Sequence, residues 1–129
     1  MIQTARGTLQ AATVIAKTTQ TLIGAEIGVA GYDYITLFFT YTKGDETGII
    51  IQAHVLQTSG SATTYQDVSW TAAAGTKTAT ANQYTLTATA SRYITFDVRG
   101  IEFIRFTQGG SNNDGTPTGT LAASYTMTK

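Results

Sequence analysis

Few side chains in this sequence could carry out a reaction. The 129 residues include one histidine, His54, eight carboxylates and no cysteine. General acid–base catalysis needs titratable side chains held at matched positions around a substrate. His54 lies in an alternating apolar segment with Ile50, Gln52 and Leu56 on its side, where a structural or surface role is expected. The sequence therefore predicts a protein that is not an enzyme and that has no catalytic residue, cofactor or metal ion.

Asp97 and Glu102 are the carboxylate pair whose spacing could matter. Two acids can hydrolyse a glycoside when they lie about 5–10 Å apart across a cleft. A tight turn at Arg99 and Gly100 would place the two acids directly opposite each other, which is unfavourable unless an arginine compensates. We therefore expect two strands that meet at a glycine corner between two sheets, with the acids paired to Arg99 or Arg105.

Charge is sparse along the chain. Charged residues make up 12%, about half of the usual ~25%, and the formal net charge is zero. No basic field exists to attract a nucleic acid or an anionic membrane, so neither is an expected partner. The N-terminal residues do not follow the pattern of a signal peptide, and no apolar run approaches the ~20 residues of a membrane span. We expect synthesis in the cytoplasm without a signal peptide.

The segments that contain these residues are predicted to be strands. Residues 93–107 form the densest apolar and β-branched run and should supply the core. Residues 34–43 and 49–57 alternate with period two around a turn at 43–48, which predicts an antiparallel hairpin. Further strands are expected at 21–29, 84–89 and 120–128, the last with Leu121, Ala123, Tyr125 and Met127 on one face.

This spacing predicts the fold class. Seven to nine short strands, about ten residues apart, are separated by turn-forming residues, and no segment has a helical period of useful length. The pattern is typical of an all-β protein with a single antiparallel β-sandwich of the jelly-roll type. Residues 21–129 are expected to form the sandwich, and residues 1–20 an N-terminal arm or edge strand.

Four apolar residues are candidates for an interface. Leu9, Val14 and Ile15 are the sizeable apolar residues of the N-terminal segment, which either is loosely ordered or reaches a neighbouring subunit. Phe38 falls on the threonine side of its strand, opposite the expected core face. It is either covered by the N-terminal segment or offered to a partner.

Several segments carry a resemblance to a known group of proteins. They are Tyr-Ile-Thr-Leu-Phe-Phe-Thr-Tyr-Thr-Lys-Gly-Asp-Glu-Thr-Gly at 34–48, the single Trp70, Tyr-Ile-Thr-Phe-Asp-Val-Arg-Gly-Ile-Glu-Phe-Ile-Arg-Phe-Thr at 93–107 and Gly-Thr-Leu-Ala-Ala-Ser-Tyr-Thr-Met at 119–127. Over roughly residues 30–129 the chain resembles small β-sandwich virion proteins of tailed bacteriophages. The resemblance implies a capsid decoration or cement protein on the outer shell surface of the virion. Its expected partners are the major capsid protein and copies of itself, as a homotrimer.

A second hypothesis assigns the same sandwich to a tail or fibre that binds carbohydrates or a receptor. Tyr65 and Trp70 would then stack on sugar rings, and the loop residues Asn112, Asn113 and Asp114 would supply hydrogen bonds. Part of a calcium-loop pattern also occurs at 112–116, but the distal glutamate that completes such a loop is missing. We expect a turn there.

Overall fold

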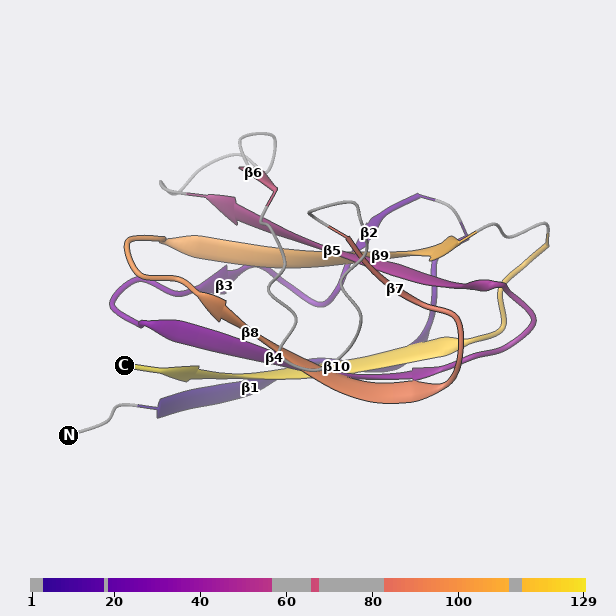
Figure 1. The fold of residues 1–129 in the computed structure, drawn as a ribbon, viewed down its shortest axis with the longest axis horizontal. Coiled ribbons are helices and arrows are strands. Elements are labelled where there is room, and N and C mark those ends of the chain that lie inside the picture. Colours follow the sequence, from indigo (N-terminus) through magenta and orange to yellow (C-terminus); the bar gives the residue numbers. More distant parts are fainter. Residues whose placement is uncertain (1–3, 18, 57–65, 68–82, 112–114) are drawn as a thin grey trace.

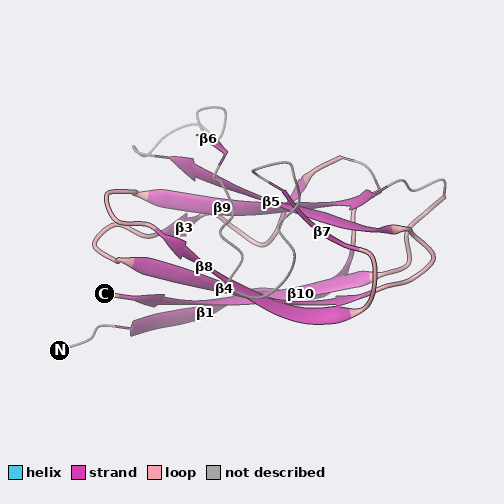
Figure 2. Cartoon of the chain, viewed as in Figure 1, coloured by secondary structure: helices cyan, strands magenta, loops and turns pink. Residues whose placement is uncertain are grey.

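The described residues of the computed structural model are 4–17, 19–56, 66–67, 83–111 and 115–129. They form ten antiparallel strands in two layers and no helix (Figures 1 and 2). The predicted all-β antiparallel sandwich is confirmed. Three of the ten strands span two residues each, and the seven longer ones match the lower end of the predicted number.

Sheet A contains four strands and sheet B six. In sheet A the order is β1 (Thr4–Val14), β10 (Thr120–Thr128), β4 (Tyr34–Thr42) and β8 (Ala90–Asp97). In sheet B the order is β2 (Thr21–Leu22), β9 (Phe103–Ser111), β5 (Gly48–Leu56) and β6 (Gln66–Asp67), with β3 (Ile27–Gly28) also on β9 and β7 (Gln83–Leu86) also on β5.

The core lies between the two sheets, and strand alternation supplies it. Alternate side chains of β4 and β10 point inward from sheet A, and those of β5 and β9 point inward from sheet B. Aromatic contacts include Phe39 with Tyr84, at 5.7 Å between ring centroids, and Phe96 with Phe106, at 5.5 Å. Each fully buried apolar side chain contributes roughly 1.5–3 kcal/mol by leaving water. The buried apolar residues are Ile15, Ile23, Ile27, Val29, Ile35, Leu37, Phe39, Tyr41, Ile49, Ile51, Ala53, Tyr84, Leu86, Ile94, Phe96, Val98, Ile104, Phe106, Leu121, Ala123 and Met127.

The predicted hairpin between β4 and β5 is wrong. β4 pairs with β10 and β8 in sheet A, whereas β5 pairs with β9, β6 and β7 in sheet B. The turn at 43–48 therefore carries the chain from one layer to the other. Both strands are central in their sheets, so the backbone N–H and C=O groups of each form hydrogen bonds with strands that are distant in sequence.

The predicted glycine corner between β8 and β9 is confirmed. β8 belongs to sheet A and β9 to sheet B, and the connection turns at Gly100, whose φ of 80° favours glycine. Asp97 is paired with Arg99 by a contact of 2.5 Å between Oδ2 and Nη2. The two residues lie at the exposed end of the sandwich.

The N-terminal segment contributes an edge strand to sheet A. β1 pairs with β10 over most of its length, with register shifts between Thr8 and Gln10 and again before Thr13. Leu9 packs against the core and Ile15 is buried in it. The strand predicted at 21–29 is two short pieces instead, β2 and β3, which both pair with β9. Gly24 separates them with a φ of 63°, and a Cβ at this position would clash with the carbonyl oxygen of Leu9, so both the backbone angle and the close approach favour glycine.

Candidate functional site

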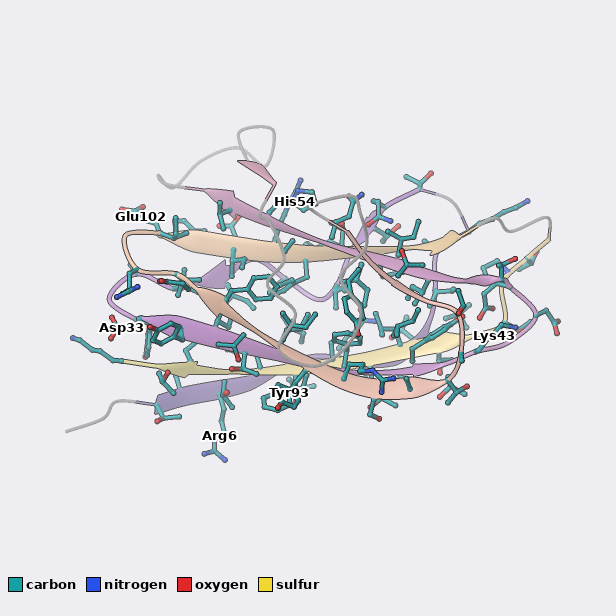
Figure 3. The ribbon with its side chains drawn as sticks, in the orientation of Figure 1. Arg6, Asp33, Lys43, His54, Tyr93 and Glu102 are labelled. Atoms are coloured by element: carbon teal, nitrogen blue, oxygen red, sulfur yellow. The ribbon has the colours of Figure 1, made fainter. Side chains whose placement is uncertain are left out.

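The outer face of sheet A carries two exposed aromatic rings among hydroxyl groups. Phe38 on β4 and Tyr93 on β8 are direct register partners, 41% and 47% exposed, with ring centroids 6.0 Å apart. Strand alternation places both outward, since their neighbours Leu37, Phe39 and Ile94 are buried. Figure 3 shows Tyr93 pointing away from the core. We call Phe38 and Tyr93 the aromatic ledge.

Hydroxyl pairs flank the aromatic ledge on both sides. Thr36 and Thr95 form a hydrogen bond of 2.8 Å between their Oγ1 atoms, and Thr40 and Ser91 form one of 3.0 Å. Both pairs join β4 to β8, two residues along each strand from the ledge. The two rings of the ledge thus lie between pairs of short hydroxyl side chains.

A groove of about 480 Å³ runs beside the aromatic ledge. Its floor is low because small residues lie next to the ring of Phe38: Ser124 on β10 is the register partner of Phe38, and Ala122 is that of Thr40. On the far side, Gln10 follows the first register shift of β1, and its Nε2 donates to the carbonyl oxygen of Leu121 at 2.8 Å. A bulge redirects side chains, which places Gln10 along the groove.

The most elaborate polar contact in the described residues lies elsewhere, under the β4–β5 connection. The carboxylate of Glu46, which is 4% exposed, accepts hydrogen bonds from the Tyr41 hydroxyl and from three backbone N–H groups. These are the N–H of Gly44 at 2.8 Å, that of Thr118 at 3.1 Å and that of Gly119 at 2.8 Å. One side chain therefore joins the 43–48 turn to the segment that leads into β10. We call it the Glu46 latch.

The hydrogen bonds decide the protonation state of the Glu46 latch. Burial by itself raises the pKa of Glu46, but the bonds from Tyr41 and from the backbone N–H groups of Gly44 and Gly119 outweigh it and lower the pKa to about 2. Burial and the neighbouring carboxylate raise the pKa of Tyr41 well above its ordinary value. At neutral pH Glu46 is thus an anion and Tyr41 its neutral donor. The latch is a buried contact between the 43–48 turn and the segment before β10.

Sequence reasoning missed this role of Glu46, and it did not identify Tyr93 as exposed. Glu46 was assigned only to the turn at 43–48, with no role for its carboxylate. The outward direction of Tyr93 was available from the sequence, because Ile94, Phe96 and Val98 alternate with it and take the core face.

A second carboxylate with a shifted pKa, Asp97, lies at the other end of the sandwich. Hydrogen bonds from the side chain and backbone N–H of Arg99 lower its pKa to about 2. The Nε atom of Arg99 lies 3.0 Å from Oδ1 of Asp97, and its guanidinium carbon lies 5.7 Å from the ring centroid of Tyr34. Asp97 and Arg99 are both strongly exposed, which makes them a surface pair.

His54 lies on the outer face of sheet B (Figure 3). Its Nε2 is 3.3 Å from Oγ1 of Thr107, whose hydroxyl donates to Oε1 of Gln20 at 2.8 Å. Because the Thr107 proton goes to Gln20, Nε2 of His54 is the donor in its own contact. The histidine thus belongs to a polar chain that fixes the segment before β2. Within the described residues no group of three or more His, Asp or Glu side chains is placed to hold a metal ion.

The predicted interface residues fall in different environments. Val14, at 56%, and Phe38 are exposed, Leu9 is half-buried, and Ile15 is 3% exposed within the core. In the single chain only Val14 and Phe38 of these four present side chains to a partner. Tyr65, Trp70, Asn112, Asn113 and Asp114, proposed for sugar binding, lie outside the described residues, and that site stays a prediction.

Comparisons with known proteins show which solved structures share this fold. No family model matches the sequence, and no curated protein is similar to it. Among solved structures, the chain resembles the SPBc2 prophage-derived protein YomS, with a TM-score of 0.63 and 15% identity, over 100% of this chain and 96% of that one. It also resembles the PBSX exported protein XepA, with a TM-score of 0.59 and 17% identity over 99% of this chain. A third similar structure is a chain of infectious bursal disease virus Gx strain, with a TM-score of 0.56 and 12% identity over 98% of this chain.

The extent of each match differs. This chain covers 38% of the XepA chain and 32% of the viral chain, so it corresponds to one part of each. At these identities the likeness shows a shared fold. In the described residues no helix has the length and apolar character required to cross a membrane.

Proposed function

We propose that the chain is a structural component of a virion that acts by binding other proteins. Three observations support this. Its fold extends over nearly the whole of a prophage-derived protein, and a viral chain contains a similar part. Among the described residues the carboxylates with lowered pKa values are Glu46 and Asp97, and each accepts hydrogen bonds from other groups of the same chain. In finer terms, we propose a capsid decoration or cement protein on the shell surface, with the major capsid protein as partner.

The strand order supports assignment to the jelly-roll type. Sheet A, in the order β1-β10-β4-β8, faces sheet B, in the order β2/β3-β9-β5-β6/β7. The chain passes repeatedly from one sheet to the other, with β2 to β3 and β5 to β7 staying in sheet B, and the first and last strands pair in sheet A. This is the order expected for two interlocked Greek keys. The alternation brings β1 to the edge of sheet A beside β10, which leaves its other edge without a described neighbour.

The observation that carries the proposal is this edge. β1 is an 11-residue strand with a single charged side chain, Arg6, and it ends at the exposed Val14. Exposed edges are usually protected by charges or proline, because their free N–H and C=O groups pair with other chains. β1 contains no proline and, apart from Arg6, no charge, so most of its edge is open to another chain. We place the contact with neighbouring subunits along this edge, in the homotrimer that the resemblance to phage β-sandwich proteins implies.

Charged substitutions test this edge without removing the strand. Deleting residues 1–20 would take Leu9 and Ile15 from the core and unfold the sandwich, so we choose Ala12→Lys and Val14→Lys, which change exposed positions. We expect light scattering to give a trimer for the original chain and smaller species for both variants. Both variants should also be lost from purified particles.

Thr87→Lys, at an exposed position between β7 and β8, adds the same charge away from the edge and serves as the control. Thr87→Lys should give the same trimer in light scattering as the original chain and should stay on purified particles. A monomer that has no affinity for shells would contradict the cement proposal. A trimer unaffected by Ala12→Lys and Val14→Lys would remove β1 from the interface.

A further inference from the structure

We infer that the groove beside the aromatic ledge is a saccharide-binding site, and that its ligand is an acidic saccharide such as one with a uronic acid unit. This inference goes beyond the proposed function and does not depend on how the chain attaches to a particle. It differs from the sequence hypothesis in place, because it uses neither Tyr65, Trp70 nor the 112–114 segment. It rests on the groove's shape, its aromatic rings and its charge.

The first argument is size and shape. A groove of about 480 Å³ lies within the ~300–1,000 Å³ range of small-molecule sites. Its floor, at Ala122 and Ser124, is lower than the ring of Phe38 because both side chains are small. A flat ligand can therefore lie against the sheet with one side against the aromatic ledge.

The second argument is the pairing of rings with hydroxyls. The C–H groups of a pyranose ring are slightly positive, and they pack favourably on the negative face of an aromatic ring. The edge of the same sugar carries hydroxyls, which need hydrogen-bond partners. The Thr40–Ser91 pair lies in the groove lining next to the ledge. In a pair of hydroxyls one proton bonds the two oxygens, and the other remains for a ligand.

The third argument is charge. Arg92 is the one charged residue among the described residues that line the groove, and no carboxylate lines it. Strand alternation directs Arg92 to the side of its register partner Phe39, but Arg92 is exposed because β8 is an edge strand, and it lines both this groove and a pocket beside residues 84–90. Its Nη1 donates to the carbonyl oxygen of Ser91, another residue of the groove lining, at 3.0 Å. Arginine matches a carboxylate with two parallel hydrogen bonds, so the groove favours an anionic ligand over a cationic one.

A protein side chain is the alternative occupant of such a groove. An apolar docking site is expected to have a continuous apolar lining, whereas here hydroxyl residues lie among the two rings and the alanines of the lining. They are Thr8, Thr40, Ser91 and Ser124. Alternation of rings and hydroxyls matches a sugar, whose own surface alternates between C–H faces and hydroxyl edges. The saccharide is therefore the occupant that the lining fits.

The experiment is a screen of the full chain on an array of mono- to tetrasaccharides. The array contains glucose, galactose and N-acetylglucosamine oligomers with matched glucuronic and galacturonic acid forms. The tightest binder is then titrated by calorimetry. We expect a uronate-containing glycan to bind more tightly than its neutral counterpart, and Phe38→Ala or Tyr93→Ala to weaken binding by about tenfold or more.

Tyr34→Ala provides the matched control. Tyr34 is an aromatic residue on the same strand, face and exposure as Phe38, 41% in both cases, but it does not line the groove. Its removal should change affinity by less than about twofold. Arg92→Ala should abolish the preference for the uronate and leave binding of the neutral glycan. All four positions are exposed, so thermal unfolding should confirm that each variant folds.

Three results would overturn the inference. One is the absence of binding to every array member at millimolar concentration. Another is binding that survives both Phe38→Ala and Tyr93→Ala, or that falls equally with Tyr34→Ala. The third is equal affinity for neutral and uronate forms, which would refute the acidic saccharide. If Phe38→Ala and Tyr93→Ala changed the oligomeric state while no glycan bound, the groove would be a protein interface instead.

Discussion

Two connections that cross between the sheets, at opposite ends of the sandwich, each hold a carboxylate with a pKa of about 2 (Figures 1 and 3). In the β4–β5 connection the carboxylate is Glu46, buried and bonded to Tyr41 and three backbone N–H groups. In the β8–β9 connection it is Asp97, exposed and paired with Arg99. The two groups have similar pKa values for different physical reasons.

The difference shows that a shifted pKa does not measure a contribution to stability. Water screens the Asp97–Arg99 pair, and exposed ion pairs contribute little because each partner is well solvated when apart. The groups that bond to Glu46 are buried and cannot exchange this contact for water. If its carboxylate is lost, the hydroxyl and the N–H groups around it are left buried without an acceptor, and each loses its hydration as well. The two ends should therefore respond very differently to the same substitution.

The largest effect is expected for Glu46→Ala. It removes the acceptor of four hydrogen bonds and should lower the free energy of unfolding by about 3–5 kcal/mol, as for other broken buried networks. Urea unfolding followed by tryptophan fluorescence or circular dichroism measures this. Asp97→Ala, the matched change at the other end, should unfold within error of the original chain. Equal losses at both ends would refute the contrast.

A smaller effect is expected for Gly119→Ala. A Cβ at Gly119 would lie 2.2 Å from Oε2 of Glu46 and 2.8 Å from the carbonyl oxygen of Thr42, so the latch would have to shift. We expect a loss of about 2–4 kcal/mol in the same unfolding assay. Gly100→Ala meets no atom within 4 Å and has only the strain of a φ of 80°, for a loss of about 1–2 kcal/mol. The reverse order would contradict the assigned roles of the two glycines.

Acid should weaken the sandwich through the same residue. The folded pKa of Glu46, about 2, lies below its ordinary value of 4.5, so its contribution is present above pH 4.5 and is lost as the pH falls towards 2. We expect the free energy of unfolding to fall by about 2–3 kcal/mol over this range. Glu46→Gln should flatten the profile. Asp97→Asn should leave most of the pH dependence of the free energy of unfolding. If Asp97→Asn removed this dependence, Asp97 and not Glu46 would be its source, which would contradict the prediction.

The smallest measurable effect is expected for Tyr41→Phe. It keeps the buried ring and removes one of the four donors to Glu46, for a loss of about 1–2 kcal/mol. The pKa of Glu46 should rise because the hydrogen bond that lowers it is gone. NMR titration of the Glu46 carboxyl carbon reports this shift. An unchanged pKa would contradict the contact.

Local sequence pattern was sufficient for the fold class and for one of these two connections. Alternation identified the inward faces of β4 and β10. At 97–102 the placement of Asp97 opposite Glu102 disfavoured a hairpin and correctly indicated a corner. At 43–48 no such conflict existed. Two alternating strands around a turn fit a hairpin and a crossing between sheets equally well, and the choice was made by pairing with β10 and β9, far along the chain.

For the sites too, local pattern predicts some features, whereas others depend on pairing between distant segments. Phe38 was identified from its place on the threonine side of β4, and its partner Tyr93 follows from the same alternation in β8. The groove depends on the register of Ser124 and Ala122 with β4 and on the shifts in β1, which no local pattern encodes. Glu46 could not be distinguished from a solvated turn residue, because its donors Thr118 and Gly119 are more than 70 residues away.

The central claim, that the chain is a protein of the virion, is tested most directly by its copy number. Virus particles released by cells that carry the gene for this chain can be purified on a density gradient and analysed by quantitative mass spectrometry. We expect the chain in a fixed ratio to the major shell protein, unchanged by further rounds of purification. Absence from the particles, or a ratio that falls with every round, would contradict the claim.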